Sequence, residues 1–481
     1  MARINEFTRI SLLNRTVQNL REVWREVADR TSGSFAASPD PNLGDKDVDP
    51  IKIQIRDCLE ARGGEVSARA RAANLGRTYL SLNAQGRRRF LQILVHEFGP
   101  DRKSVDRAAA HLQKAETDTV ERLKAEQELR QTLRPPWLRL LTQFNGLPEG
   151  VHFLVDLRAE LLSFCKDDPA LAVLEKELKA LLAFWFDVGF LELRRIEWDS
   201  PASLLEKLIV YEAVHAIQSW DDLKKRLHWD RRCFAFFHPR MPNEPLIFVE
   251  IALVNGIADS IQKLLDGDAP VIDPHEADTA IFYSISNAQA GLAGISFGSF
   301  LIKRVVDVLA DEFKNLKTFA TLSPIPGFRA WLNSQLTAPV EKAEAKLLLP
   351  SERKVLQALA VDPSNKGILK TLLDTSNWHK KSEFVKALKA PLMRLCAHYL
   401  VEEKHPDGVA LDRVAHFHLS NGARIERLNW LGNTSSEGCR QSAGIMVNYR
   451  YKLDDIEANH EAYTGEKRVR ISSSVRSLSR S

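Results

Sequence analysis

Two short segments of the chain carry residues that can exchange protons. Ser323 opens the stretch Ser-Pro-Ile-Pro-Gly-Phe, in which two prolines stiffen the loop and Pro324 holds the serine extended. His418 stands in His-Phe-His-Leu-Ser-Asn-Gly, an alternating run that ends at an Asn-Gly turn signal. A positioned hydroxyl and an imidazole suffice for proton transfer without a metal. Taken alone, a serine before proline is more often a turn former, and a strand histidine is more often structural.

A glycine-rich turn at residues 289–298 offers a second kind of chemistry. Its sequence, Gln-Ala-Gly-Leu-Ala-Gly-Ile-Ser-Phe-Gly, follows a strand-like run and precedes a helical pattern. Glycines let the backbone approach a ligand closely, and a helix N-terminus offers free N–H groups and a partial positive charge. The turn therefore suits a pyrophosphate group, although a glycine-rich turn without a ligand fits the same pattern.

The sequence shows no metal or nucleotide motif. It contains no His-x-x-x-His pair, no P-loop, no Gly-x-Ser-x-Gly elbow and no cluster of acids at metal-ligand spacing. The spacing of its five cysteines fits no zinc template and predicts reduced thiols in a cytosolic protein. These cysteines are Cys58, Cys165, Cys233, Cys396 and Cys439.

Length and composition are those of a soluble globular protein. The 481 residues allow about three domains of ~150 residues or two larger ones. A net charge of +4 with 27% charged residues does not suggest a nucleic-acid binder. No apolar run approaches the ~20 residues of a membrane span, no signal peptide is apparent, and the chain does not end in Ser-Lys-Leu. We therefore expect a cytoplasmic protein.

The first part of the chain has the pattern of a helical bundle. Apolar residues recur at helical spacing, glycines are few, and only residues 32–50 lack periodicity and predict a mobile loop. We expect an all-α domain over residues 1–192. The predicted helices cover residues 14–31, 67–80, 84–97, 104–132, 155–164 and 169–188.

The second part, residues 193–481, has a mixed pattern. A strand-like run at 280–286, the glycine-rich turn, an amphipathic helix at 297–313 and a run at 319–322 predict a βαβ unit. Residues 414–419 and 424–430 alternate on both sides of Asn421-Gly422 and predict a hairpin. The other predicted elements are strands at 232–238 and 246–253, a helix from 200 to 215, and helices within 341–399.

The segments at 323–328 and 416–430 closely resemble the signature segments of malonyl-CoA decarboxylase. Further stretches are similar to that family in the same order, so that the resemblance covers roughly residues 195–455. They are Phe-Phe-His-Pro-Arg-Met-Pro-Asn-Glu-Pro-Leu at 236–246, Phe-Tyr-Ser-Ile-Ser at 282–286, Gly-Leu-Ala-Gly at 291–294, Phe-Leu-Ile-Lys-Arg-Val-Val at 300–306, Ala-Pro-Leu-Met-Arg-Leu-Cys at 390–396 and Val-Asn-Tyr-Arg-Tyr at 447–451. Each stretch alone is weak, but the ordered series is specific. The N-terminal part carries no diagnostic stretch.

The resemblance implies a fold and a reaction. The fold is a helical domain followed by a mixed α/β, acetyltransferase-like (GNAT-type) catalytic domain. The reaction is decarboxylation of malonyl-CoA to acetyl-CoA and CO2 through a thioester enolate, with Ser323 and His418 as catalytic residues that also bind substrate. We expect His418 to deliver the proton to the α-carbon, because the unperturbed pKa of histidine near ~6.5 allows either protonation form near neutrality. Ser323 either accepts a proton or orients the histidine and holds the malonyl carboxylate.

The resemblance also implies further contacts and partners. Ser284 and Tyr451 are expected to support the site, although core packing suits both. We expect no cofactor beyond the coenzyme A of the substrate. We further expect no nucleic-acid or membrane partner, and a homo-oligomer, a tetramer or dimer of dimers, formed mainly by the helical domain. The malonyl-CoA contact is placed at Ala293, Gly294, Ile295, Ser296, Phe297, Gly298 and Ser299.

Several points stay open from sequence alone. His416 lies on the same face of the predicted strand as His418, and only the family motif selects His418. Lys207 and His215 have no assigned role. A CoA-dependent acyltransferase and a non-enzymatic acyl-CoA sensor are the alternative functions, and the biological context, malonate use or control of fatty-acid synthesis, is undetermined.

Overall fold

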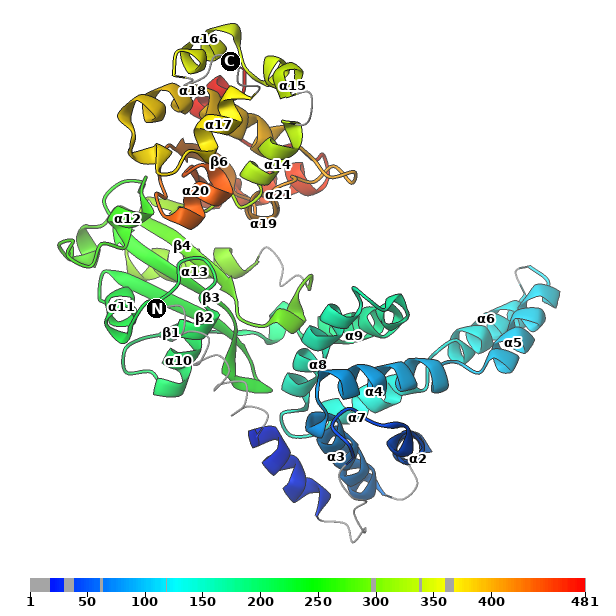
Figure 1. The fold of residues 1–481 in the computed structure, drawn as a ribbon. Coiled ribbons are helices and arrows are strands. Elements are labelled where there is room, and N and C mark those ends of the chain that lie inside the picture. The colour runs from blue at the N-terminus through cyan, green and yellow to red at the C-terminus, as the bar shows by residue number, and fades with distance from the viewer. Residues whose placement is uncertain are drawn as a thin grey trace. The chain divides into compact units, whose positions relative to one another are not determined.

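The structure is a computed structural model that describes residues 18–29, 39–60, 64–117, 119–295, 300–336, 340–359 and 367–480. The chain forms two compact units, which are described separately (Figure 1). The first unit comprises residues 1–192 together with 237–246 and 288–296, and the second comprises the remainder. The domain boundary expected between residues 192 and 193 stays a prediction. The two later segments, 237–246 and 288–296, belong to the first compact unit although they follow that boundary in the sequence.

The first unit is helical. Its core contains an aromatic cluster in which Trp24 stacks parallel to Phe144 at 6.3 Å and meets Phe153 edge-on at 4.8 Å between ring centroids. Gly76 lets this ring approach, since a Cβ there would lie 2.1 Å from the Trp24 side chain. Trp24 belongs to a helical stretch at residues 18–28. The later helices are α2 (Asp45–Glu60), α3 (Glu65–Ser81), α4 (Ala84–Glu97), α5 (Arg102–Lys114), α6 (Val120–Thr132), α7 (Trp137–Asn145), α8 (Gly150–Phe164) and α9 (Ala172–Trp185).

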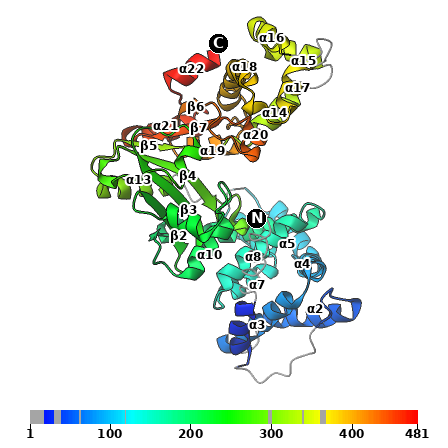
Figure 2. The ribbon, with the colours of Figure 1, turned by 60° about the vertical axis from the view of Figure 1, so that its left-hand side comes forward.

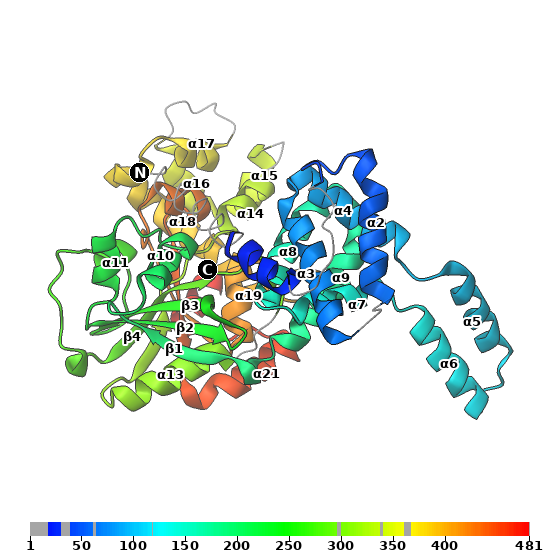
Figure 3. The same cartoon turned by 90° about the horizontal axis from the view of Figure 1, so that it is seen from below.

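Two of the predicted elements in this unit were wrong. The helix predicted over 104–132 is the hairpin of α5 and α6, which extends away from the neighbouring helices (Figure 3). Thr119 caps the second helix by accepting from the backbone N–H of Arg122 at 3.1 Å, so the Ala- and Glu-rich run is interrupted. The loop predicted over 32–50 is helical from Asp45 onward, while residues 32–38 lie outside the described residues.

The second unit is built on a seven-stranded mixed sheet. The strand order is β1-β2-β3-β4-β5-β7-β6, and β4 and β5 form a parallel pair between antiparallel neighbours. The family resemblance implied a mixed α/β, acetyltransferase-like core, and this sheet is that core. The strands are β1 (Glu192–Ile196), β2 (Arg231–His238), β3 (Met241–Val254), β4 (Thr279–Asn287), β5 (Thr318–Thr321), β6 (Arg424–Asn429) and β7 (Met446–Tyr451).

The predicted βαβ unit is confirmed by the parallel pairing of β4 and β5 around helix α13 (Phe300–Glu312), which lies beside both strands in Figure 2. The β4 strand carries a bulge, because Ser284 pairs with Glu250 and Phe282 pairs with Ile251, which leaves Tyr283 without an opposite residue. The pairing of β4 with β5 also ends at Phe282. The far end of β4 is therefore free to border a ligand pocket.

The second unit also contains helices. The helical pattern predicted within 341–399 and the helix that begins near residue 200 are both found. Besides α13, the helices of eight or more residues are α10 (Ala202–Tyr211), α14 (Phe328–Gln335), α15 (Val340–Leu347), α16 (Pro350–Gln357), α18 (Ser382–Val401), α19 (Arg413–Ser420), α21 (Ile456–Thr464) and α22 (Ser473–Arg480). The shorter helices are α11 (Trp220–Arg226), α12 (Ile261–Leu264), α17 (Ile368–Asp374) and α20 (Ser436–Ser442).

The hairpin predicted around Asn421-Gly422 was wrong in its first strand. Residues 413–420 form helix α19, whose N-terminus is capped by Asp412 through the backbone N–H groups of Val414 and Ala415 at 2.9 and 3.0 Å. Gly422 ends the helix with φ of +79°, and the bonds from Gly422 to Leu419 and from Ala423 to His418 form a Schellman motif. The Asn-Gly pair is thus a helix terminator here. The second predicted strand is confirmed as β6.

Candidate active site

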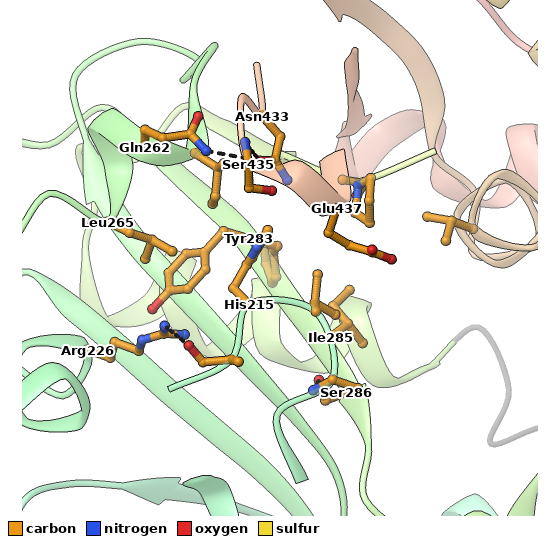
Figure 4. Close-up of a pocket in the computed structure, with 18 of the residues that line it drawn as sticks. His215, Arg226, Gln262, Leu265, Tyr283, Ile285, Ser286, Asn433, Ser435 and Glu437 are labelled. Carbon is orange, nitrogen blue, oxygen red and sulfur yellow. Dashed lines mark hydrogen bonds between the residues drawn. The ribbon is translucent and has the colours of Figure 1, made fainter. Parts of the chain in front are cut away.

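A pocket of about 1380 Å³ lies within the second unit (Figure 4). Its wall is formed by the segment 213–219 and α11, by the end of β4, by the residues after β5, by α19, and by the segment 433–441. Ser323 and His418 both line it, although 95 positions separate them in the sequence. The tertiary structure therefore brings the two predicted catalytic residues into one cavity.

Ser323 is fixed by backbone bonds at the end of β5. Its N–H donates to the carbonyl of Val447 at 2.8 Å, and its carbonyl accepts from the N–H of Val447 at 3.0 Å, so that it bridges to β7. Its hydroxyl donates to Oγ1 of Thr321 at 2.8 Å, and its Oγ lies 3.1 Å from Nε2 of His418. The Ser323 side chain is therefore held between Thr321 and the imidazole.

His418 is enclosed by aromatic side chains from β7. Its ring stacks on Tyr449 with centroids 4.5 Å apart and planes 24° apart. Its Nδ1 lies 2.7 Å from the hydroxyl of Tyr451. Both ring nitrogens of His418 thus have a partner, Ser323 on one side and Tyr451 on the other.

Burial decides the protonation state of His418. The loss of water around the ring lowers its pKa from the ordinary 6.5 to about 3, so that only the neutral form is present near neutral pH. Burial also raises the pKa of Tyr451 well above its usual value, which keeps its phenol protonated. We therefore assign the Tyr451 O–H as the donor to Nδ1, which leaves the single imidazole proton of His418 on Nε2, facing Ser323.

His416 does not share the site, contrary to the face predicted for a strand. On helix α19 two residues separated by two positions point in different directions. The Nδ1 of His416 lies 2.9 Å from the hydroxyl of Tyr463, and His416 is absent from the pocket wall. The structure therefore separates the two histidines and brings only His418 to Ser323.

Ser284 acts behind the pocket rather than in its wall. Its Oγ donates to the buried carboxylate of Glu212, with oxygen distances of 2.9 and 2.7 Å, and Ser286 adds a bond of 3.1 Å. Glu212 also accepts from the backbone N–H groups of Val214 and His215 at 2.8 and 2.6 Å. This carboxylate pins the segment after α10 to β4, so Ser284 positions the pocket wall.

Sequence reasoning missed Thr321, Tyr449 and Glu212. Thr321 and Tyr449 could have been found from the sequence, because each lies two positions before a predicted site residue and alternate residues of a strand share a face. Thr321 and Ser323 at the end of β5, and Tyr449 and Tyr451 on β7, are such pairs. No local pattern marks Glu212 as part of the site, because the side chains that bond to it, such as Ser284, lie 72 positions away on β4.

The expected coenzyme segment is described only in part. Ser296, Phe297, Gly298 and Ser299 lie outside the described residues, while Ala293, Gly294 and Ile295 belong to the first unit. Gly294 has φ of +71°, a conformation that favours glycine. A Cβ at this position would lie 3.2 Å from Nζ of Lys179, so the ammonium group of Lys179 lies next to the turn. Arg158 donates to the carbonyl of Ala293 at 2.9 Å and steadies it.

Lys207 and His215 lie in different settings. Lys207 is part of α10 and is not in the pocket wall, whereas His215 lines the pocket. All five cysteines are free. Among the described residues, no group of three or more His, Cys, Asp or Glu could hold a metal ion, and no helix has the length and apolar character needed to span a bilayer.

A buried hydroxyl–imidazole pair in the wall of a deep pocket, beside the parallel strands of a mixed sheet, defines an enzyme that moves protons on a bound small molecule. Comparison with known proteins defines the family. The family model of the malonyl-CoA decarboxylase C-terminal domain matches residues 189–481, and the model of the N-terminal domain matches residues 98–186. The chain belongs to the malonyl-CoA decarboxylase family, which is a family of carboxy-lyases.

Curated relatives and solved structures agree over most of the chain. Mitochondrial malonyl-CoA decarboxylase of Anser anser anser is 41% identical, covering 85% of this chain and 83% of the relative, and that of Rattus norvegicus is 38% identical, covering 92% and 89%. The crystal structure of malonyl-CoA decarboxylase from Rhodopseudomonas palustris has a TM-score of 0.80 at 42% identity, covering 89% of this chain and 99% of that one. The protein from Agrobacterium vitis has a TM-score of 0.79 at 39% identity, with the same coverage. The predicted fold class, a helical part followed by a mixed α/β part, is confirmed.

Proposed function

We propose that this protein decarboxylates malonyl-CoA to acetyl-CoA and CO2 and that Ser323 and His418 carry the chemistry. The observation that carries the proposal is the contact of 3.1 Å between the Ser323 hydroxyl and Nε2 of His418 in the pocket wall. Family membership supplies the substrate class, and the contact supplies a group that can protonate a carbanion.

Loss of CO2 needs little from the protein. When the bond between the α-carbon and the carboxylate breaks, its electron pair moves to the α-carbon and is delocalised onto the thioester oxygen as an enolate. The neutral Ser323 hydroxyl suits the malonyl carboxylate, because a cation there would stabilise the charged ground state more than the transition state. The buried setting of Ser323 also keeps water away from the carbanion.

Protonation of the enolate is the step that we assign to His418. Its Nε2–H forms the new C–H bond, and its Nδ1 takes the proton of the Tyr451 hydroxyl at 2.7 Å. A neutral imidazole alone is a poor acid, so this second transfer is what allows His418 to release its proton. Exchange with solvent then restores the Tyr451 proton, and one malonyl-CoA and one proton have become acetyl-CoA and CO2.

We assign coenzyme binding to residues 293–299, as the family resemblance implied. The glycine conformation at Gly294 and the nearby ammonium of Lys179 support this assignment, because both suit a phosphate group against the backbone.

Purified protein should release CO2 from malonyl-CoA and form an equal amount of acetyl-CoA with no acyl acceptor present. Ser323→Ala should remove most of this activity, and an exposed substitution such as His228→Leu serves as the control. A wild-type protein that forms acetyl products only when an acceptor amine or alcohol is added would instead be an acyltransferase.

We further propose that the reaction needs no metal or organic cofactor, because the thioester itself accepts the electron pair. Dialysis against a strong chelator should leave kcat unchanged. Loss of turnover after dialysis, with recovery on adding a divalent ion, would contradict this proposal.

A homo-oligomer, tetramer or dimer of dimers, is proposed for the assembly. Large apolar side chains on the surface of the helical unit support it, such as Phe184 at 79% exposure and Val120 at 69%. Light scattering of the purified protein tests the state directly.

A cytoplasmic location is proposed on the basis of the free thiols. The goose and rat relatives are named as mitochondrial, and free thiols suit that compartment equally, so cell fractionation must decide.

A further inference from the structure

The hydrogen-bond chain through the catalytic pair continues beyond Ser323 to Thr321, the last residue of β5. The Ser323 hydroxyl donates to Oγ1 of Thr321 at 2.8 Å, and the backbone N–H of Tyr449 donates to the same oxygen at 3.1 Å. Thr321 is fully buried and does not belong to the pocket wall, so a substrate in the pocket does not reach it. Any influence of the Thr321 side chain on the reaction therefore passes through Ser323.

Thr321 is a fixed acceptor for the proton of Ser323. The Thr321 carbonyl accepts from the side-chain amide of Asn448 on β7 at 2.7 Å, and its Cα lies opposite Phe282 in the parallel pairing of β4 with β5. The two lone pairs of its hydroxyl oxygen are occupied by the Ser323 hydroxyl and the Tyr449 N–H. Strand pairing and side-chain bonds thus hold this oxygen in place, and the Ser323 proton points to it.

This bond decides what Ser323 presents to His418. Because the Ser323 hydroxyl gives its proton to Thr321, the Ser323 oxygen faces the imidazole with a lone pair. Nε2 of His418 lies 3.1 Å from that oxygen, so a hydrogen bond forms only when Nε2 carries the ring proton. Nδ1 then accepts from the Tyr451 hydroxyl at 2.7 Å. In this arrangement the protons of Tyr451, His418 and Ser323 all have an acceptor.

The opposite tautomer loses one hydrogen bond. With the ring proton on Nδ1, that proton bonds to the Tyr451 oxygen, and the Ser323 hydroxyl turns from Thr321 to Nε2. The Tyr451 proton is then left without an acceptor among the hydrogen bonds of the described residues. One hydrogen bond favours the Nε2–H form about 3- to 10-fold. We propose that Thr321 is a positioning residue that, acting through Ser323, keeps the ring proton of His418 on Nε2.

The proposed function gives this tautomer its use, because Nε2–H is the group that we assign to protonate the enolate. With the ring proton on Nδ1, His418 holds that proton toward Tyr451 instead of toward Ser323. The catalytic part of this inference therefore rests on the proposed function, whereas the location of the ring proton does not.

NMR of protein labelled with nitrogen-15 in its histidines measures the tautomer, because a ring nitrogen with a proton and one with a free lone pair give separate signals. The spectrum of His418→Asn identifies the signals of His418. Wild type should show mainly Nε2–H. Thr321→Val keeps the shape but removes the acceptor, so either tautomer leaves one hydroxyl proton unpaired, and the ratio should fall about 3- to 10-fold, to near equality.

Two matched variants control this measurement. Thr321→Ser keeps the acceptor oxygen and should keep the wild-type ratio. Thr318→Val makes the same substitution at the first residue of β5 and should leave the ratio unchanged. An unchanged ratio in Thr321→Val would overturn the proposal.

Tyr451→Phe tests the chain from its other end and decides if Thr321→Val does not fold. Without the Tyr451 hydroxyl, the bond from Ser323 to Thr321 should by itself keep His418 mainly in the Nε2–H form, by about 3- to 10-fold. Near-equal amounts of the two tautomers in Tyr451→Phe would overturn the proposal, because they would show that Thr321 does not direct the chain.

Kinetics separate this inference from the proposed function. In Thr321→Val, kcat/KM for malonyl-CoA should fall about 2-fold, in step with the fraction of free enzyme that has lost the Nε2 proton, while the Kd for coenzyme A stays at the wild-type value. A shift in tautomer without this loss would overturn the catalytic role of Thr321. A wild-type protein that binds coenzyme A but releases no CO2 would refute the proposed function and leave the tautomer comparison intact.

Discussion

Lowering the pH from 8 to 5 should leave kcat/KM for malonyl-CoA nearly constant, because His418 does not titrate in this range. With a pKa of about 3, only about 1% of the imidazole is protonated at pH 5. An ordinary imidazole with a pKa of about 6.5 would be about 97% protonated there, and a reaction that needs the neutral ring would lose about 30-fold. Since kcat/KM reports the free enzyme, the two cases are separated by one pH profile.

The assay is the initial rate of CO2 release at low substrate concentration, started by diluting enzyme from pH 7.5 into each buffer. His416→Asn serves as the matched control, since it removes the neighbouring imidazole that bonds to Tyr463 and not to Ser323. Parent and control should give the same flat profile. A decline of about 30-fold centred near pH 6.5 in both proteins would refute the argument that a buried, neutral His418 delivers the proton.

The same shift in pKa predicts how stability depends on pH. The folded pKa of His418 lies below the unfolded value, so the unfolded state binds this proton first as the pH falls. His418 therefore costs no stability above about pH 6.5 and destabilises the fold increasingly down to about pH 3, by about 2 kcal/mol at pH 5. Urea denaturation at pH 8 and pH 5 should show a smaller difference for His418→Asn than for the wild type.

Three substitutions test the assigned roles further. Ser323→Ala should lower kcat by about 10²-fold while the Kd for coenzyme A stays near the wild-type value, and a normal kcat would remove the serine from the mechanism. His418→Asn should lower turnover by about 10²- to 10⁴-fold and His416→Asn far less, so equal losses would mean that the wrong imidazole was chosen. Tyr451→Phe should lower kcat about 10-fold with little change in KM, because Nδ1 of His418 loses its 2.7 Å donor; an unchanged kcat would show that the imidazole does not draw on the Tyr451 proton.

Local sequence determined most of the sheet. Strands β2, β3, β4 and β5 coincide with short apolar or alternating runs, and the glycine-rich turn between β4 and α13 marks the parallel connection from β4 to β5. These elements could be predicted because a strand or helix that buries one face must repeat its apolar residues at its own period. The choice of Ser323 and His418 came from their place in the family motifs, and the structure brings them within 3.1 Å of each other.

Tertiary structure decided how His418 works. The alternation of residues within 413–420 fits a strand. The buried residues Ala415, His418 and Leu419 are spaced as on one face of a helix, and the N-terminal cap from Asp412 favours the helix. The low pKa of His418 comes from desolvation by packed segments such as β7, which lies about 30 residues further along the chain. Sequence supplies the imidazole, but burial and hydrogen bonding are set by residues remote in the chain. Only the folded protein therefore determines that His418 is neutral and that its one ring proton lies on Nε2.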